Sequence, residues 1–335
     1  MKFIGDCLES IMKQTVWVKE EFDIKIAINV VDNGSQDGTL EFIKKEYPFV
    51  HILKNINNLG FCRANNQAIR MHNTEWVLII NPDVILEPDF LEKLLTAAQK
   101  SKEDVGALAS KILRIETQVE NGGLTRVVKT NKIDSYGLEV KKSRQVKNIG
   151  EGEDDEGQYD EVSEVFGFAG TCVLLRRDAL EDIAFREEYL DEDFFAYQDD
   201  YDLAYRLQLY GWRAKFVPRA VAYHFRSAQA TDLSIGKLFK IIRARRQKSR
   251  QINYHSYKNH LFVLFKNEIN ENFWRHFFPI LWFEFKKFIY VLLFEQKTLG
   301  ALGQVFKKFK TMRLKRKIIL GRRKVTAEYM RQWFK

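Results

Sequence analysis

Short apolar runs rich in β-branched residues alternate with segments of helical periodicity through the first third of this 335-residue chain. The sequence predicts strands at 24–31, 51–53, 76–80 and 105–110, and helices at 4–14, 40–46, 61–71 and 90–100. Strands that alternate with helices at this pace are joined by crossover connections, which place successive strands parallel. The pattern therefore predicts an α/β fold with a mostly parallel sheet and helices on both faces.

This regular alternation stops after the strand at 105–110. Residues 121–164 are glycine-rich and carry an acidic run at 150–161, for which a solvated, irregular loop is the expectation. The elements predicted beyond it are a strand at 166–176 opened by a glycine turn, a helix at 200–210 capped by Gly211, and a strand at 214–217.

Charge is divided unevenly along the chain. The net charge is +9, yet residues 231–335 hold 25 Lys and Arg against 6 Asp and Glu, while residues 1–230 hold 29 against 39. Such asymmetry indicates an acidic body and a basic arm that meets a polyanion or an anionic membrane. We therefore expect two units, 1–230 and 231–335.

The composition places the chain among globular proteins. An apolar fraction of 45% and a charged fraction of 30% exclude a disordered or collagen-like chain. Cys7, Cys62 and Cys172 lack the spacing of a zinc site or a redox pair, which indicates free thiols in a reducing cytosol. The first twenty residues carry charges and no apolar run, so no signal peptide is expected.

The first predicted strand ends in the turn DNGSQDGT at 32–39. An Asp at the carboxyl end of a strand can accept hydrogen bonds from a nucleobase or ribose, and the N-terminus of the next helix suits phosphate. Asp32 is therefore a candidate for binding a nucleotide. The residues leave open an alternative, in which this is a plain helix start capped by Ser35 or Asp37.

A second turn, NPDV at 81–84, follows the predicted buried strand at 76–80. One carboxylate beside a rigid proline can hold a divalent cation against a diphosphate, because Mg²⁺ commonly uses one or two protein carboxylates together with substrate phosphates. Asp83 is the candidate ligand. The alternative is a simple turn in which Asp83 hydrogen-bonds its own backbone.

Three acidic residues, Asp199, Asp200 and Asp202, gather at the start of the predicted helix at 200–210. Acids complement the positive end of a helix dipole, which is an ordinary structural use. A carboxylate placed behind two aromatic residues, where water is excluded, also suits a general base for a hydroxyl group. His224 follows a predicted strand, and both a structural role and a ligand role stay open for it.

Five segments carry these features in a fixed order along about residues 6–227. They are VVDNGSQDGT at 30–39, NLGFCRANNQAIR at 58–70, IINPDV at 79–84, FGFAGTCVLLRRDAL at 166–180, and FFAYQDDYDLAYRLQLYGWRAKFVPRAVAYH at 194–224. Together they resemble glycosyltransferase family 2, nucleotide-sugar enzymes with a GT-A fold. The NPDV turn, the GFAG turn and the acidic stretch are most similar to the rhamnosyltransferase-like branch.

The resemblance implies roles for individual residues. Asp200, with Asp199 beside it, falls where the family keeps its catalytic base. Asp83 and His224 match positions that hold Mg²⁺ or Mn²⁺ against the two phosphates. The residues implied on the nucleotide-sugar side are Asp32, Asn33, Ser35, Gly60, Arg63, Asn65, Asn66 and Asp83. Those implied on the acceptor side are Gly167, Gly170 and Thr171.

The resemblance also implies a reaction. Asp200 would take the proton of an acceptor hydroxyl as its oxygen attacks the anomeric carbon opposite the departing diphosphate, which inverts that centre. The metal would stabilise the charge on the leaving group. dTDP-rhamnose is the leading donor by resemblance, ahead of UDP-hexoses, and the expected acceptor is lipid-linked or a polysaccharide.

Two alternative functions follow from what the chain lacks. Members of the family begin with an apolar strand before a helix like the one at 4–14, and this chain starts at that helix. Either the true start lies upstream of Met1, or the chain is a catalytically impaired, nucleotide-sugar-binding remnant, which is the main alternative function. A nucleotidyltransferase is disfavoured, since no glycine-rich, lysine-bearing phosphate loop is visible near the N-terminus.

The basic arm contains the aromatic stretch FWRHFFPILWFEFKKFIYVLLF at 273–294. Its length suits a membrane span, but each of its charges would cost about 2.5–3.5 kcal/mol at the bilayer centre. We expect instead an amphipathic helix in the membrane interface, with basic clusters at 307–310 and 313–317 on anionic lipid. This predicts a cytoplasmic protein, peripheral on the inner face of the membrane, and disfavours nucleic acid as a partner.

Overall fold

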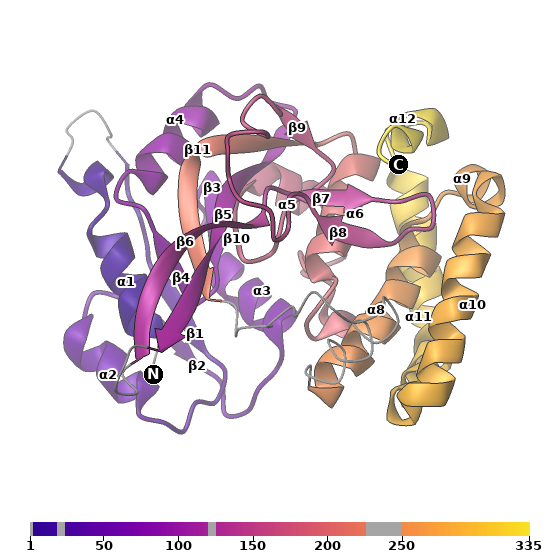
Figure 1. The fold of residues 1–335 in the computed structure, drawn as a ribbon, viewed down its shortest axis with the longest axis horizontal. Helices are drawn as coiled ribbons and strands as arrows, with labels where there is room; N and C mark the ends of the chain where they lie inside the picture. The colour runs from indigo at the N-terminus through magenta and orange to yellow at the C-terminus, as the bar shows by residue number, and fades with distance from the viewer. Residues whose placement is uncertain (1–2, 19–23, 120–124, 226–248) are drawn as a thin grey trace.

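The structure is a computed structural model that describes residues 3–18, 24–119, 125–225 and 249–335. Figure 1 shows a body built around a sheet, with a stack of helices beside it. The helices of the body are α1 (Ile4–Met12), α2 (Thr39–Glu46), α3 (Phe61–Met71), α4 (Phe90–Gln99), α5 (Arg177–Ile183) and α6 (Asp199–Leu209), with the short 3-10 helices η1 (Thr15–Trp17) and η2 (Glu192–Phe194). The helices predicted from periodicity between residues 4 and 210 are present within about two residues of their expected bounds.

The strands form one large sheet and two small ones. They are β1 (Asn29–Asp32), β2 (His51–Lys54), β3 (Trp76–Ile80), β4 (Val84–Leu86), β5 (Val105–Val119), β6 (Thr125–Ser135), β7 (Leu138–Val140), β8 (Val146–Asn148), β9 (Glu164–Val165), β10 (Cys172–Arg176) and β11 (Arg213–Phe225). The large sheet has the order β3-β10-β5-β11-β4, and β6 is added on β5 and β9 on β11. β1 pairs with β2, and β7 with β8.

The large sheet is mixed, so the prediction of a mostly parallel sheet is wrong in this detail. β11 is parallel to β5, whereas β10 is antiparallel to both β3 and β5, and β4 is antiparallel to β11. The cause is insertion, because β10 comes late in the sequence yet lies between two earlier strands. Alternation along a sequence predicts the connections of consecutive strands and carries no signal for a strand that enters later. Parallel pairing does hold for β1 with β2 and for β5 with β11.

Helices cover both faces of the sheet, as expected. Ala107 and Val173 point into a hydrophobic core shared with α5 and α6, and their neighbours Leu108 and Leu174 point into a second core shared with α1 and α4. This alternation follows from the period of two along a strand, which sends successive side chains to opposite faces.

β1 and β3 belong to different sheets, and each has an edge without a partner strand among the described residues. A cavity of about 440 Å³ lies between them, lined by apolar residues such as Ile26, Ile28, Trp76 and Leu78. Regular pairing starts only at Asn29, later than the strand predicted at 24–31.

The irregular sequence pattern over 121–164 gives no sign of the strands that the structure has in residues 125–164. Within this range β6 extends the sheet beside β5, and β7 and β8 form a hairpin. The acidic run at 150–161 is a mostly exposed loop of turns, as expected, although Asp155 and Asp160 each lie 2.9 Å from the Nζ atom of the buried Lys111. The sequence of β6, TRVVKTNKIDS, lacks the apolar run by which a buried strand is recognised.

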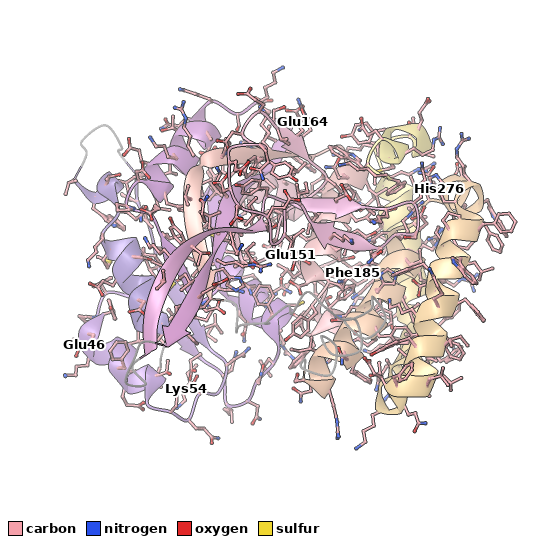
Figure 2. All side chains as sticks on the ribbon, in the orientation of Figure 1. Glu46, Lys54, Glu151, Glu164, Phe185 and His276 are labelled. Atoms are coloured by element: carbon pink, nitrogen blue, oxygen red, sulfur yellow. The ribbon has the colours of Figure 1, made fainter. Side chains whose placement is uncertain are left out.

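The C-terminal helices pack on the body and share its core. They are α8 (Arg250–Asn267), α9 (Asn270–Arg275), α10 (Phe277–Phe294), α11 (Gly300–Arg322) and α12 (Ala327–Arg331), with the 3-10 helix η3 (Gln296–Leu299). Phe262 and Met312 belong to the same core as Tyr205 of α6. Figure 2 labels His276 where the β7–β8 hairpin approaches these helices. The boundary expected at residue 230 lies outside the described residues.

Candidate active site

The start of α6 presents two neighbouring carboxylates. Asp200 is held by two backbone amides, since Gly170 N donates to its Oδ2 at 3.2 Å and Tyr201 N to its Oδ1 at 2.8 Å. Burial raises the pKa of both Asp199 and Asp200, and the charge of Asp200 raises that of Asp199 further. A fixed carboxylate whose pKa is shifted upward toward neutrality is suited to accept a proton as a general base.

Asp202, the third acid of this cluster, is paired with cations inside the fold. It lies 2.9 Å from Arg206 Nε and 2.8 Å from Lys266 Nζ, and it accepts a hydrogen bond from Asn267. Asp191 is paired in the same buried network with Lys266 and Lys315. These two carboxylates are therefore used to anchor α8 and α11 to the body.

The glycine turn before β10 lies directly against Asp200. A Cβ atom on Gly170 would lie 3.2 Å from the Cβ atom of Asp200, and one on Gly167 would overlap Ala204 of α6. Thr171 O accepts a hydrogen bond from Asn81 N at 2.9 Å. The turn implied on the acceptor side thus connects the two carboxylates to the NPDV segment.

Asp83 and His224 meet because β4 and β11 pair, with His224 opposite Val84. The Nε2 atom of His224 lies 3.5 Å from Asp83 Oδ2, and its Nδ1 atom lies 2.8 Å from Asp134 Oδ2. Asp83 Oδ1 is buried and has no hydrogen-bond partner among the described residues. A carboxylate behind one imidazole nitrogen directs the other toward a metal ion, so this pair fits a divalent cation.

The cation ligands available here are few. Within the described ranges, no group of three or more His, Cys, Asp or Glu side chains could hold a metal ion. Mg²⁺ is commonly coordinated by one or two protein ligands, with substrate phosphates and water in its other coordination positions. The residues therefore fit a cation that binds together with a diphosphate.

Asp32 is the last residue of β1, and only one of its two carboxylate oxygens accepts a hydrogen bond from the described residues. Ser35 N donates to Oδ1 at 3.1 Å, while Oδ2 is buried and has no hydrogen-bond partner among the described residues. Such an acceptor suits a ligand N–H or O–H group. Asp37 serves the helix start instead, since it accepts a hydrogen bond from Thr39 N. The turn therefore contains a residue that caps the helix start and a separate carboxylate oxygen that is open to a ligand.

The residues implied near the diphosphate all make contacts within the protein. Asn33 donates to Gly60 O, and Asn66 exchanges hydrogen bonds with the backbone of Leu190, so both are engaged within the protein. Asn65 donates to the backbone of its own helix, and Arg63 lies 3.6 Å from Glu192.

Gly60 lies at the N-terminus of α3 and contacts the loop before α6. It has a φ of +88°, and a Cβ atom there would lie 2.5 Å from the ring of Phe195. Cys62 N donates to Phe195 O at 3.2 Å. We call residues 195–198 the α6 loop, since they lead directly to Asp199. The N-terminus of α3 and the start of α6 are therefore adjacent through this loop.

Two functional contacts escape sequence reasoning. Asp134, which orients His224, lies in a segment predicted to be irregular. Asn259, which holds the α6 loop, lies in the segment interpreted as a membrane arm. The available signal in α8 is its run of polar residues at helical positions that end up buried, Asn253, Lys258, Asn259 and Asn267.

Comparisons with known proteins identify the family. The sequence matches the family model Glycosyl transferase family 2 over residues 1–184 and the model Glycosyl transferase family group 2 over residues 154–300. The chain belongs to glycosyl transferase family 2, and it is a glycosyltransferase.

Two curated relatives and one solved structure add detail. The chain is 27% identical over 225 residues to the N-acetylglucosaminyl-diphospho-decaprenol L-rhamnosyltransferase of Mycobacterium tuberculosis, covering 60% of this chain and 67% of that protein. It is 26% identical over 230 residues to an N-acetylglucosaminyltransferase of Mesorhizobium japonicum, covering 65% and 47%. The crystal structure of GalNAc-T7 with UDP, GalNAc and Mn²⁺ superposes with a TM-score of 0.53 at 13% identity, covering 78% of this chain and 45% of that one. The GT-A fold and the rhamnosyltransferase-like resemblance are thereby confirmed.

Proposed function

We propose that this enzyme transfers rhamnose, with inversion, from dTDP-rhamnose to a lipid-linked acceptor. The observation that carries the proposal is the Asp200 carboxylate, which the amides of Gly170 and Tyr201 hold at the head of α6. The choice of sugar and acceptor is supported by the mycobacterial relative, an N-acetylglucosaminyl-diphospho-decaprenol L-rhamnosyltransferase. The next candidates are UDP-hexoses as the donor and a glycan as the acceptor.

In the proposed reaction, Asp200 receives the proton of the acceptor hydroxyl. The acceptor oxygen forms a bond to the anomeric carbon while the bond to the diphosphate oxygen breaks on the opposite face, releasing a nucleoside diphosphate. Asp32 Oδ2 accepts a hydrogen bond from an N–H or O–H group of the nucleotide. Asp83 and His224 would hold Mg²⁺ or Mn²⁺, which when bound stabilises negative charge on the leaving diphosphate.

Release of the nucleoside diphosphate from candidate nucleotide sugars, measured with Mn²⁺ and an acceptor, tests this proposal. Asp200→Asn should lower turnover by roughly 10²–10⁴-fold, the usual contribution of a general base, while donor binding persists. Asp199→Asn is the matched control on the neighbouring carboxylate. If Asp200→Asn keeps wild-type turnover and Asp199→Asn loses it, the general base is Asp199 instead. Undiminished transfer in EDTA would reject the metal function of Asp83 and His224.

The partner surface that we propose is an anionic membrane. α10 is apolar, yet of its 18 residues only Ile280 and Val291 are buried. The side chains of Trp274, Phe278 and Trp282 are 69%, 82% and 60% exposed. No helix among the described residues is long and apolar enough to cross a membrane. Exposed aromatic residues beside the basic α11 therefore support binding at the lipid surface.

Flotation with anionic vesicles tests the membrane proposal. The Phe278→Glu and Trp282→Glu double variant changes exposed positions only, so it should fold normally and lose flotation. Phe49→Glu, at a 51% exposed aromatic residue of the body, is the matched control and should float like the wild type. Unchanged flotation of the double variant would refute this surface. A dimer that the double variant dissociates, without lipid binding by the wild type, would show that α10 is an oligomer interface instead.

One observation favours the second candidate, a donor-binding protein with impaired turnover. The cavity between β1 and β3 leaves the edge of β1 unsupported directly upstream of Asp32. A nucleotide sugar at 100 times its dissociation constant stabilises a binding protein by about 2.7 kcal/mol, whether or not it turns over. Thermal stabilisation by dTDP-rhamnose without release of dTDP would therefore support this candidate.

A further inference from the structure

The α6 loop, which leads to the proposed base, has a strained backbone. Phe195 has φ 67° and ψ −63°, and Ala196 N donates to Phe194 O at 2.9 Å, which closes a three-residue turn around it. This positive-φ form of the γ-turn is rare. Tyr197 and Gln198 follow at φ 70° and 62°, in the left-handed region that side chains other than glycine disfavour. Interactions from outside the loop must hold this conformation.

Asn259 of α8 provides such interactions. Its Nδ2 atom donates to the carbonyl oxygens of Phe194, Ala196 and Tyr197 at 3.0, 2.8 and 2.7 Å. The residue is fully buried, so water does not compete for these bonds. Because three acceptors converge on one point, only a donor group is tolerated there, and a side-chain amide has two N–H bonds to share.

Neighbouring residues of α8 cover the same segment. Lys258 Nζ donates to Asp193 O at 2.6 Å, and the ring of His255 stacks on the ring of Phe195 with centroids 4.9 Å apart. Gly60 contacts Phe195 from the side of α3. The α6 loop is therefore enclosed between α3 and α8, and the C-terminal unit provides one of its two walls.

We infer that Asn259 is a positioning residue for the catalytic base, so that the C-terminal unit completes the active site. The inference rests on the proposed function of Asp200. The three hydrogen bonds fix the path of the loop, and the loop fixes where α6 begins and thus where the carboxylate of Asp200 lies. Without them, Tyr197 and Gln198 would relax toward ordinary backbone angles. A displacement of about 1 Å at a reacting group lowers rates by about 100-fold.

The test compares Asn259→Ala with the wild type in the full chain, using the release assay over a range of pH. We expect kcat to fall by about 10–100-fold while the donor dissociation constant stays close to that of the wild type. The acid limb of the pH profile should move to lower pH, because burial is what raises the pKa of Asp200.

Asn272→Ala is the matched control. Asn272 is also fully buried and holds a backbone carbonyl, that of Ala327, but it lies in α9. Its loss should lower the melting temperature without changing kcat or the pH profile at a temperature where both variants are folded. A positioning residue is thus distinguished from one that only stabilises the fold.

Wild-type kcat and an unmoved acid limb in Asn259→Ala would overturn the inference. If that variant does not fold, Asn259→Ser keeps one donor, and wild-type kcat in it would overturn the inference equally. Asp200→Asn is measured in parallel. If Asp200→Asn keeps wild-type kcat, the proposed base itself is rejected. If Asp200→Asn loses activity while Asn259→Ala keeps wild-type kcat, only the positioning function of Asn259 is rejected.

Discussion

Substituting Arg144 by methionine is expected to lower the free energy of unfolding by about 3–5 kcal/mol, the typical loss when one partner of a buried ion pair is removed. Arg144 lies in the β7–β8 hairpin, and Glu268 lies between α8 and α9. Their side chains meet twice, Nε to Oε2 at 2.6 Å and Nη2 to Oε1 at 2.7 Å. The residues are 1% and 2% exposed, so water cannot solvate the carboxylate that Arg144→Met would leave behind.

An exposed pair between the same two parts of the molecule is the control. Lys335 Nζ lies 2.8 Å from Glu139 Oε2, as close as the buried pair, but the lysine side chain is 68% exposed. Pairs of this kind contribute about 0–1 kcal/mol, so Lys335→Met should have little effect. The contrast isolates burial as the cause of the large effect.

Urea and thermal unfolding measure the change. A loss of about 3–5 kcal/mol should lower the melting temperature by about 4–7 °C at this chain length. Arg144→Met combined with Glu268→Leu should recover much of the loss, because two apolar partners leave no buried charge. A single variant within about 1 kcal/mol of the wild type, or a double variant no more stable than the single one, would refute the reasoning. Separate transitions for the body and the C-terminal helices would do so as well.

Three further outcomes are expected. Because burial raises the pKa of Asp200 and the base acts when deprotonated, kcat/KM should fall as pH drops through an inflection above the ordinary carboxyl value of about 4; an inflection at or below that value in the pH profile would contradict this. Gly60→Ala should destabilise by about 1–3 kcal/mol in urea unfolding, while Gly303→Ala, whose Cβ would meet nothing within 4 Å, should stabilise slightly. Asp134→Asn should weaken Mn²⁺ binding, measured by calorimetry with nucleoside diphosphate present, by about 10–100-fold; an unchanged affinity would separate Asp134 from the cation site.

Local patterns predict most of the helices and several strands of the body, but not the arrangement of the sheet. The periodicity of 61–71 and the apolar run of 76–80 depend on neighbours in sequence, and α3 and β3 match them. The position of β10 between β3 and β5 depends on pairing over about 65–100 residues, which no local pattern encodes. β6 is not predicted because a strand that extends the sheet beside β5 can form with few apolar residues.

The candidate site shows the same division. Asp83 and Asp200 were identifiable because each follows directly on a recognisable strand or helix start. Asp134 acts through the Nδ1 atom of His224, 90 residues away in sequence. Asn259 acts on carbonyl groups of the backbone, which have no residue identity to mark them. Motifs therefore locate the groups proposed to touch substrate, whereas the groups that orient them require the three-dimensional structure.

The buried pairs between the acidic body and the C-terminal helices also set an order for biosynthesis. Asp191 and Asp202 are synthesised well before Lys266 and Lys315, which neutralise them. At roughly 5–20 residues per second, these carboxylates leave the ribosome several seconds ahead of their cations. During that interval they must stay hydrated, because burying an unpaired charge is prohibitive. The buried network around Asp191 therefore cannot close until α11 has emerged from the ribosome.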